Sequence, residues 1–149
     1  MKKTIIKTAA IVLVLALMLS TVAFASVTSS AYISATNAYI IRSGDDVTVY
    51  FYIVGRNIMD KIGAKKILLY ENNWDNTWTL VKTFDSADSM YTSDLLSTNT
   101  TAKSSSVTYT EGSATKNYYA LVRFYAEKDG GSDTIPQDTP TSYGTGGTP

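Results

Sequence analysis

The hydrophobic pattern of the chain alternates most regularly between residues 118 and 126. One alternate set is apolar and consists of Tyr118, Ala120, Val122, Phe124 and Ala126, while the other is amphipathic and consists of Tyr119, Leu121, Arg123 and Tyr125. A period of two is typical of a β-strand with one buried side. We therefore predict a central strand whose first set faces the core, followed by a hairpin at Gly130 and Gly131.

Other segments of high β-propensity predict further strands. They span residues 32–41, 47–54, 64–71, 77–84, 106–110 and 134–141, with turn-forming residues between them. The expected core side of the second segment consists of Val47, Val49, Phe51 and Ile53. Pro136 confines the last strand to a sheet edge. Residues 67–70 are apolar on both alternates, so the pattern does not decide which side of that strand is buried.

Two segments depart from the strand pattern. Ile58, Met59 and Ile62 are spaced as on a helical turn, which predicts a short helical crossover. Residues 85–106 are rich in Ser, Thr and Asp and predict a surface segment with at most one edge strand.

About seven short strands without a long amphipathic helix predict one all-β domain, a single antiparallel two-sheet sandwich. An eight-stranded barrel is the alternative architecture.

The first 25 residues predict a secretory signal peptide. Lys2, Lys3 and Lys7 precede an apolar run over residues 9–19, and small residues lead to Ala25. This run is shorter than the ~20 apolar residues of a membrane-spanning helix, so cleavage after Ala25 is favoured over a membrane anchor. The expected divisions are a signal peptide (1–25), a flexible leader (26–30), the sandwich domain (31–141) and a disordered tail (142–149).

Charge and composition limit the classes of partner. The chain has 13 basic and 13 acidic residues, and removal of the three lysines in the signal peptide leaves a net charge of about −3. Nucleic acids and anionic membranes require a clustered basic surface, so we expect neither as a partner of the mature chain. The chain has no cysteine, which excludes disulfides and a lipid-attached N-terminus. Secretion is expected, with release and retention at the cell wall both left open.

The sequence offers little catalytic chemistry, and we expect no enzyme. The absence of histidine excludes a Ser-His-Asp triad and imidazole metal sites. Most acids fall in turns, which Asp favours for reasons of backbone geometry. The segment from Asp129 to Asp133 resembles a calcium loop only loosely, so neither a metal nor a cofactor is expected. A carboxylate-based glycosidase, which needs two acids ~5–9.5 Å apart in one cleft, is the least favoured function.

Residues 107–131, VTYTEGSATKNYYALVRFYAEKDGG, resemble the end of a fibronectin type III or immunoglobulin-like domain. The resemblance implies a sandwich in which Tyr118 is the "tyrosine corner", whose hydroxyl bonds to the upstream backbone. The chain departs from fibronectin type III at Phe51, where that family often has Trp. The segments KIGAKKI (61–67) and WTLVKTF (78–84), together with the signal peptide, also resemble small uncharacterised secreted proteins of clostridia and related bacteria. That likeness implies no known activity.

Aromatic residues supply the remaining functional signal. Tyr119, Leu121, Arg123 and Tyr125 are expected to point outward from the central strand, with Trp78 as a neighbouring contributor. Rigid rings on a sheet suit a glycan or a protein partner at the cell surface, although ordinary cross-strand packing also explains them. We predict a secreted, non-catalytic binding or adhesion module with this ligand face. The alternative is a structural or self-associating protein, a homodimer through the same aromatics.

Overall fold

The computed structural model describes residues 30–72 and 77–144. The predicted signal-peptide helix, its cleavage site and most of the predicted leader lie outside the described residues. The described chain is an all-β, antiparallel structure, as the hydrophobic pattern predicts. No helix within these two ranges has the length and apolar character needed to cross a bilayer.

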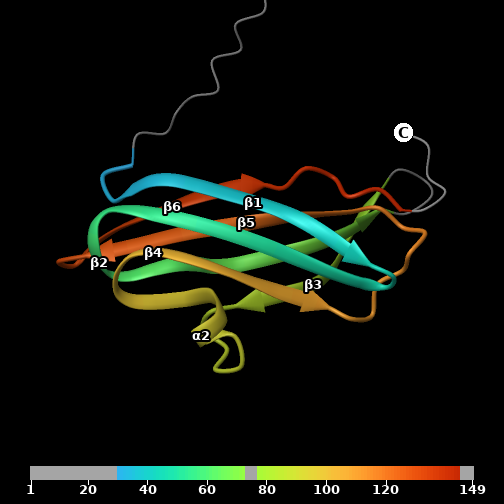
Figure 1. Cartoon of the computed structure of the whole chain (residues 1–149), viewed down its shortest axis with the longest axis horizontal. Helices are drawn as coiled ribbons and strands as arrows, with labels where there is room; N and C mark the ends of the chain where they lie inside the picture. The colour runs from blue at the N-terminus through green and yellow to red at the C-terminus, as the bar shows by residue number, and fades with distance from the viewer. Residues whose placement is uncertain (1–29, 73–76, 145–149) are drawn as a thin grey trace, which may run out of the picture.

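Six strands and a one-turn helix make up the described fold (Figure 1). They are β1 (Ile33–Ser43), β2 (Asp46–Asn72), β3 (Trp78–Asp85), α2 (Thr92–Leu95), β4 (Leu96–Tyr109), β5 (Tyr118–Lys128) and β6 (Gly131–Asp138). All of the strands belong to one hydrogen-bonded antiparallel sheet. The number is six rather than about seven because the predicted strands 47–54 and 64–71 are both parts of the long strand β2.

Strand β2 bends sharply near Gly55, and β4 bends with it, as both ribbons show at the left end of Figure 1. The first half of β2 pairs with β1 and β4, and the second half of β2 pairs mainly with β5 and β3. The register against β4 shifts between Val54 and Met59, which places the corner there. The predicted helical crossover over residues 58–62 is therefore wrong. Met59 and Ile62 are buried at the corner while Ile58 is exposed, and this spacing imitates a helical turn.

The hydrophobic core lies between the two halves of the folded sheet. The predicted core sides of β2 and β5 are both confirmed: the buried residues are Val47, Val49, Phe51, Ile53, Tyr118, Ala120, Val122, Phe124 and Ala126. The rings of Phe51 and Phe124 meet edge to face, with centroids 6.4 Å apart, so the two halves pack directly on each other. Burial of this apolar area is the main favourable contribution to folding.

The structure decides which side of residues 67–70 is buried. Ile67 and Leu69 face the core opposite Val122 and Ala120, whereas Leu68 and Tyr70 are half-buried on the outer side. Both alternates are apolar because the second half of β2 lies between β5 and β3, where neighbouring side chains cover even the outer residues.

The Ser- and Thr-rich segment over residues 85–106, predicted as a surface segment with at most one edge strand, contains α2 and most of the edge strand β4. Strand β4 pairs with β2 from Leu96, opposite Gly63, to Tyr109, opposite Val47. Its start is anchored by Leu95, which is fully buried. In the described chain β4 pairs with β2 alone and β6 pairs with β5 alone, so both are edge strands. The edge position of Pro136 in β6 agrees with the prediction.

Contacts at the two ends of the described domain reach beyond the expected limits of 31 and 141. The Ser30 hydroxyl donates a hydrogen bond to Asp133 Oδ2 (2.5 Å), which also accepts the Ala31 backbone N–H (2.8 Å). The hydrogen bond from the Ser30 hydroxyl is the main cause that lowers the pKa of Asp133, and the bond from the Ala31 N–H adds to it. Near the other end, Ser142 and Tyr118 exchange two backbone hydrogen bonds. Ser30 and Ser142 thus contact the domain where the sequence predicts a flexible leader and tail.

Candidate functional site: the outer side of β5, β2 and β3

The predicted ligand face lies on the outer side of β5. Tyr119, Leu121 and Tyr125 are half-buried, and Arg123 is exposed. These four side chains alternate with the fully buried set, so the predicted direction of each side chain agrees with the structure. Trp78 belongs to β3, on the far side of β2 from β5.

Four residues on this outer side form an aromatic cluster, which we define as Tyr70, Trp78, Leu80 and Tyr119. The rings of Tyr70 and Tyr119 stack with centroids 4.9 Å apart and planes inclined by 6°. The Trp78 ring meets Tyr119 edge-on at 4.7 Å. Trp78 is 38% exposed and Leu80 is 47% exposed. The cluster therefore presents one aromatic and one aliphatic side chain to solvent on top of a stacked pair of tyrosines.

Strand register explains why these residues meet. Tyr70 of β2 lies opposite Tyr119 of β5 on one side and opposite Leu80 of β3 on the other. Trp78 lies opposite Asn72, two pairs further along and on the same side. The register of β3 shifts by one residue beside Leu69 and Tyr70, so that Leu80 and Trp78 lie on the outer side with Tyr70, whereas Phe84 beyond the shift faces the core. A bulge of this kind redirects side chains without ending the pairing.

The outer side carries charges next to the cluster. Lys66 pairs with Asp85 across β2 and β3 (2.8 Å), and Arg123 of β5 lies opposite Lys66. The hydrogen bond from Lys66 lowers the pKa of Asp85, and the Ala87 backbone N–H adds to the effect. Ligands on this side thus meet an aromatic surface and both signs of charge within a few residue spacings.

Tyr125 stands apart from the aromatic cluster. Its hydroxyl donates to Glu127 Oε2 (2.5 Å), and the Lys65 ammonium lies 5.0 Å from its ring centroid. Its partner on β2 is Gly63, which has no side chain to pack against the ring, and its partner on β6 is Thr134. Burial raises the pKa of both Tyr119 and Tyr125, so both phenols are neutral hydrogen-bond donors at neutral pH. The structure thus brings Trp78 and Tyr119 together and leaves Tyr125 with separate partners.

Sequence reasoning missed Tyr70 and Leu80 as members of the site. Tyr70 lies in the segment whose buried side the pattern left undecided. Leu80 and Trp78 share the outer side with Tyr70 only because of the bulge in β3. A tyrosine that follows three apolar residues in a central strand was the one available signal, and it becomes informative only once the register is known.

Several of the described carboxylates bind structural partners. Glu71 accepts from the Tyr118 hydroxyl (2.5 Å), Asp45 accepts the Ala114 N–H, and Asp60 accepts the Asp129 N–H. The two carboxyl groups whose pKa is displaced, Asp85 and Asp133, are both displaced downward, whereas a general acid needs a raised pKa. No group of three or more metal-ligating acids occurs in residues 30–72 and 77–144. This arrangement gives no support to the glycosidase alternative.

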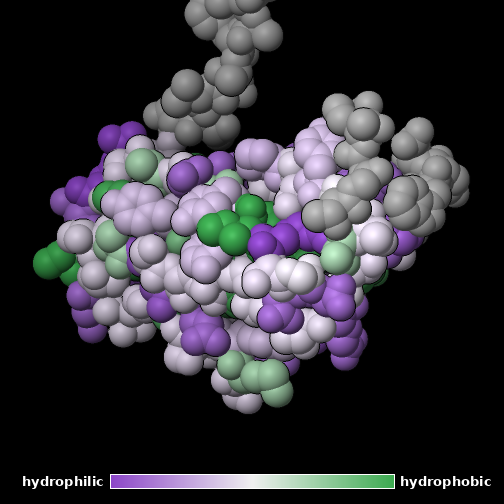
Figure 2. All heavy atoms as spheres, turned by 45° about the vertical axis from the view of Figure 1, so that its right-hand side comes forward, coloured by the Kyte–Doolittle hydropathy of each residue, from purple (hydrophilic) through white to green (hydrophobic). Residues whose placement is uncertain are grey.

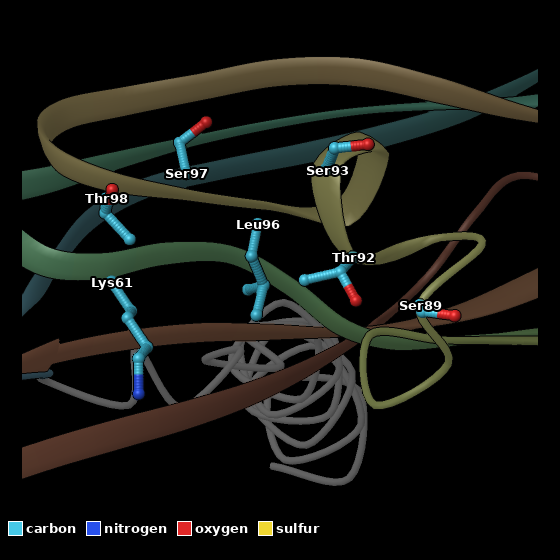
Figure 3. Close-up of a pocket in the computed structure, with 7 residues that line it drawn as sticks. All are labelled: Lys61, Ser89, Thr92, Ser93, Leu96, Ser97 and Thr98. Carbon is cyan, nitrogen blue, oxygen red and sulfur yellow. The ribbon is translucent and has the colours of Figure 1, made fainter.

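A shallow depression of about 340 Å³ lies between β2, α2 and β4 (Figure 3). It is lined by Lys61, Ser89, Thr92, Ser93, Leu96, Ser97 and Thr98. Lys61 points away from the hydroxyls of Ser97 and Thr98 in this view. The Thr92 hydroxyl already donates to backbone carbonyls of Ser86 and Asp88. The polar groups therefore do not converge on one point, as a catalytic or binding pocket would require.

Tyr118 holds the turn at one end of β5. Its hydroxyl accepts the backbone N–H of Ser113 (2.8 Å) and donates to Glu71, while the Arg42 guanidinium lies 5.3 Å from its ring centroid. Arg42 also donates to the backbone carbonyls of Ser113 and Lys116, at 2.6 Å each. The bond to Ser113, five residues upstream, is the contact that the resemblance to a tyrosine corner implies.

Tyr118→Phe is expected to lower the free energy of unfolding by about 1–3 kcal/mol, because Ser113 and Glu71 each lose a buried partner. Burial, and then the bond to Glu71, raise the pKa of Tyr118 from 10.0 to about 12. A raised folded pKa contributes stability that is complete below pH 10 and is lost as pH rises through about 12. Urea unfolding between about pH 8 and about pH 12 should show a shallower alkaline loss in the variant than in the wild type. Equal slopes would contradict the assignment.

Comparison of the chain with models of protein families, with curated proteins and with solved structures finds no match. The sequence pattern and the geometry of the described residues therefore bear the functional argument.

Proposed function

We propose that this protein is a secreted, non-catalytic binding or adhesion module whose ligand contacts the aromatic cluster on the outer side of β5, β2 and β3. The observation that carries the proposal is the exposure of Trp78 and Leu80 above the stacked Tyr70 and Tyr119 rings. Contiguous exposed apolar patches are uncommon on monomeric domains and often mark binding sites. Rings already held by neighbours lose little conformational entropy when a ligand arrives.

One sequence feature supports an extracellular setting for this module. The N-terminal pattern of lysines, an apolar run and small residues before Ser26 is that of a signal peptide. The absence of cysteine leaves packing as the source of stability, and the buried core of the folded sheet supplies it. The proposed ligand is a glycan or a protein at the cell surface.

We also propose that the folded sheet is a two-sheet sandwich of the immunoglobulin or fibronectin type III kind. The corner shared by β2 and β4 separates the strands into two halves that enclose the core. The hydrogen bond between Ser113 and Tyr118 supports the same interpretation. Domains of this kind often serve as recognition scaffolds, which is an argument by analogy of fold.

The ligand is first identified with the wild type on an array of glycans and cell-surface proteins. The paired substitution Trp78→Ala with Tyr119→Ser is expected to abolish binding to that ligand or to weaken it by at least about 30-fold. Truncation of aromatic anchors typically costs ~2 kcal/mol or more of binding free energy. Met90→Ala is the matched control, because Met90 is a large apolar residue that is 70% exposed and lies outside the cluster. Tyr125→Ser should also retain binding, because Tyr125 has separate partners.

Interpretation of the binding measurement requires the folded state of each variant to be known. Near-UV circular dichroism should show that the Trp78 and Tyr119 variant keeps a folded core, since neither side chain belongs to the buried set. Binding that is retained in this folded variant would overturn the proposed site. Unfolding of the variant would show that the cluster is part of the core packing.

The exposed cluster also fits the self-associating alternative, a homodimer through the outward aromatics. Size-exclusion chromatography with light scattering separates the two functions. A monomer at micromolar concentration counts against the dimer, whereas a dimer that Trp78→Ala dissociates would replace the binding module as the explanation of the cluster.

A further inference from the structure

A second outer surface, on the other half of the folded sheet, consists entirely of uncharged side chains. It is formed by β1, the first half of β2 and the second half of β4. Register places its side chains in four cross-strand rows: Ala35, Val54 and Ala102; Asn37, Tyr52 and Ser104; Tyr39, Tyr50 and Ser106; Ile41, Thr48 and Thr108. We call these rows the uncharged face. The next paired row introduces a charge, at Asp46.

The uncharged face combines exposed rings with a line of small hydrogen-bonding groups. Tyr39 and Tyr52 are each 44% exposed and Ile41 is 50% exposed. Tyr39 stacks on Tyr50 with centroids 5.2 Å apart and planes inclined by 8°, so the two rings support each other. Thr48 and Thr108 share a hydrogen bond of 2.9 Å across the strands. Much of the view in Figure 2 is covered by pale side chains of intermediate hydropathy, the class to which Tyr, Ser and Thr belong.

This face differs in charge from the surface around the aromatic cluster. The outer side of β5, β2 and β3 carries Arg123, Lys66 and Asp85, whereas no side chain in the four rows can form an ion pair. A partner with charged groups would lose their hydration here without gaining a counter-charge. Charge complementarity therefore favours an uncharged partner that brings its own hydroxyl groups.

The size of the face argues against a second copy of the chain as that partner. Three strands ~4.8 Å apart and four rows ~6.7 Å apart cover roughly 400 Å². A standard stable protein interface buries about 800 Å² on each partner. A few sugar rings need less area, because their apolar faces pack on tyrosine rings and their hydroxyls bond to Ser, Thr and Asn.

We propose that the uncharged face is a second binding site, which takes a neutral polysaccharide. The sugar chain lies over the exposed rings of Tyr39 and Tyr52 and bonds to the hydroxyl groups of β4. This site is separate from the aromatic cluster, so each of the two can be removed by substitution without the other.

Depletion of the full secreted chain from solution by insoluble neutral polysaccharides tests this site, with microcrystalline cellulose, chitin and insoluble β-1,3-glucan as probes. We expect retention on at least one of them, unchanged between low and high salt because no charges take part. Tyr39→Ser with Tyr52→Ser should reduce retention at least tenfold. Ser104→Lys places a charge beside Tyr52 at an exposed position and should reduce retention without depending on loss of a ring.

Met90→Ala, at an exposed apolar residue outside both surfaces, is the control and should leave retention on the polysaccharide unchanged. Trp78→Ala tests whether the retention belongs to the aromatic cluster instead. Retention that Trp78→Ala abolishes, or that the Tyr39 and Tyr52 variant and Ser104→Lys both leave intact, would overturn the second site. Failure of all the neutral probes would also overturn it. A concentration-dependent dimer that Ser104→Lys dissociates would show that the face joins two copies of the chain instead.

Discussion

Phe124→Ala is expected to lower the free energy of unfolding by about 3–5 kcal/mol, which is a large share of the stability of a small domain. Phe124 is fully buried in β5 and packs edge-on against Phe51 from the other half of the sheet. Its removal leaves a cavity between the two halves, because close-packed neighbours collapse only in part. Equilibrium urea unfolding, monitored by circular dichroism, measures the difference.

Arg123→Ala is the matched control for this substitution. Arg123 is the adjacent residue of the same strand, but its side chain is exposed on the outer side. Its truncation should change stability by less than about 0.5 kcal/mol. Similar losses for the two variants would contradict the assignment of inner and outer sides in β5.

Gly63→Ala is expected to lower the free energy of unfolding by about 3 kcal/mol or more, at least as much as Phe124→Ala. The backbone of Gly63 has φ +154°, and strain of that kind costs an L side chain roughly 1–3 kcal/mol. A Cβ at this position would also lie 1.9 Å from the carbonyl oxygen of Leu95, so the buried end of α2, where the chain enters β4, would have to move. A shift of the urea midpoint, or loss of soluble protein, reports the effect.

Gly130→Ala is the control that separates the backbone strain at Gly63 from the clash of its added Cβ with the Leu95 carbonyl. Gly130 has φ +79°, but no heavy atom lies within 4 Å of a Cβ placed there. Its substitution should cost only the backbone penalty, about 1–2 kcal/mol. If Gly63→Ala proved no more harmful than Gly130→Ala, the tight contact between β2 and β4 would be excluded.

The sequence predicts well those strands in which one alternate set is apolar and the other is not. Residues 47–54 and 118–126 are of this kind, and their buried sides agree with the structure. Strand β4 could not be found in the same way, because its Ser- and Thr-rich residues are mostly exposed or half-buried. Pairing with β2 along its whole length holds it in place, and strand pairing over that distance is not visible in local pattern.

The corner in β2 is a second feature that the hydrophobic pattern does not predict. A strand that changes direction also changes the side on which its buried residues fall, so Met59 and Ile62 acquire the spacing of a helix. The candidate site shows the same limit. The direction of Tyr119 follows from its own strand, but its contacts with Tyr70 and Trp78 depend on the register of three strands and on a bulge in β3.

Chemical-shift mapping of the ¹⁵N-labelled secreted chain, titrated with the strongest binder from the array, tests most directly whether the ligand sits on the outer side of β5. We expect shifts concentrated at Tyr70, Leu80, Tyr119 and the Trp78 indole N–H. Shifts centred instead on the depression beside α2, at Lys61 and over residues 89–98, would contradict it.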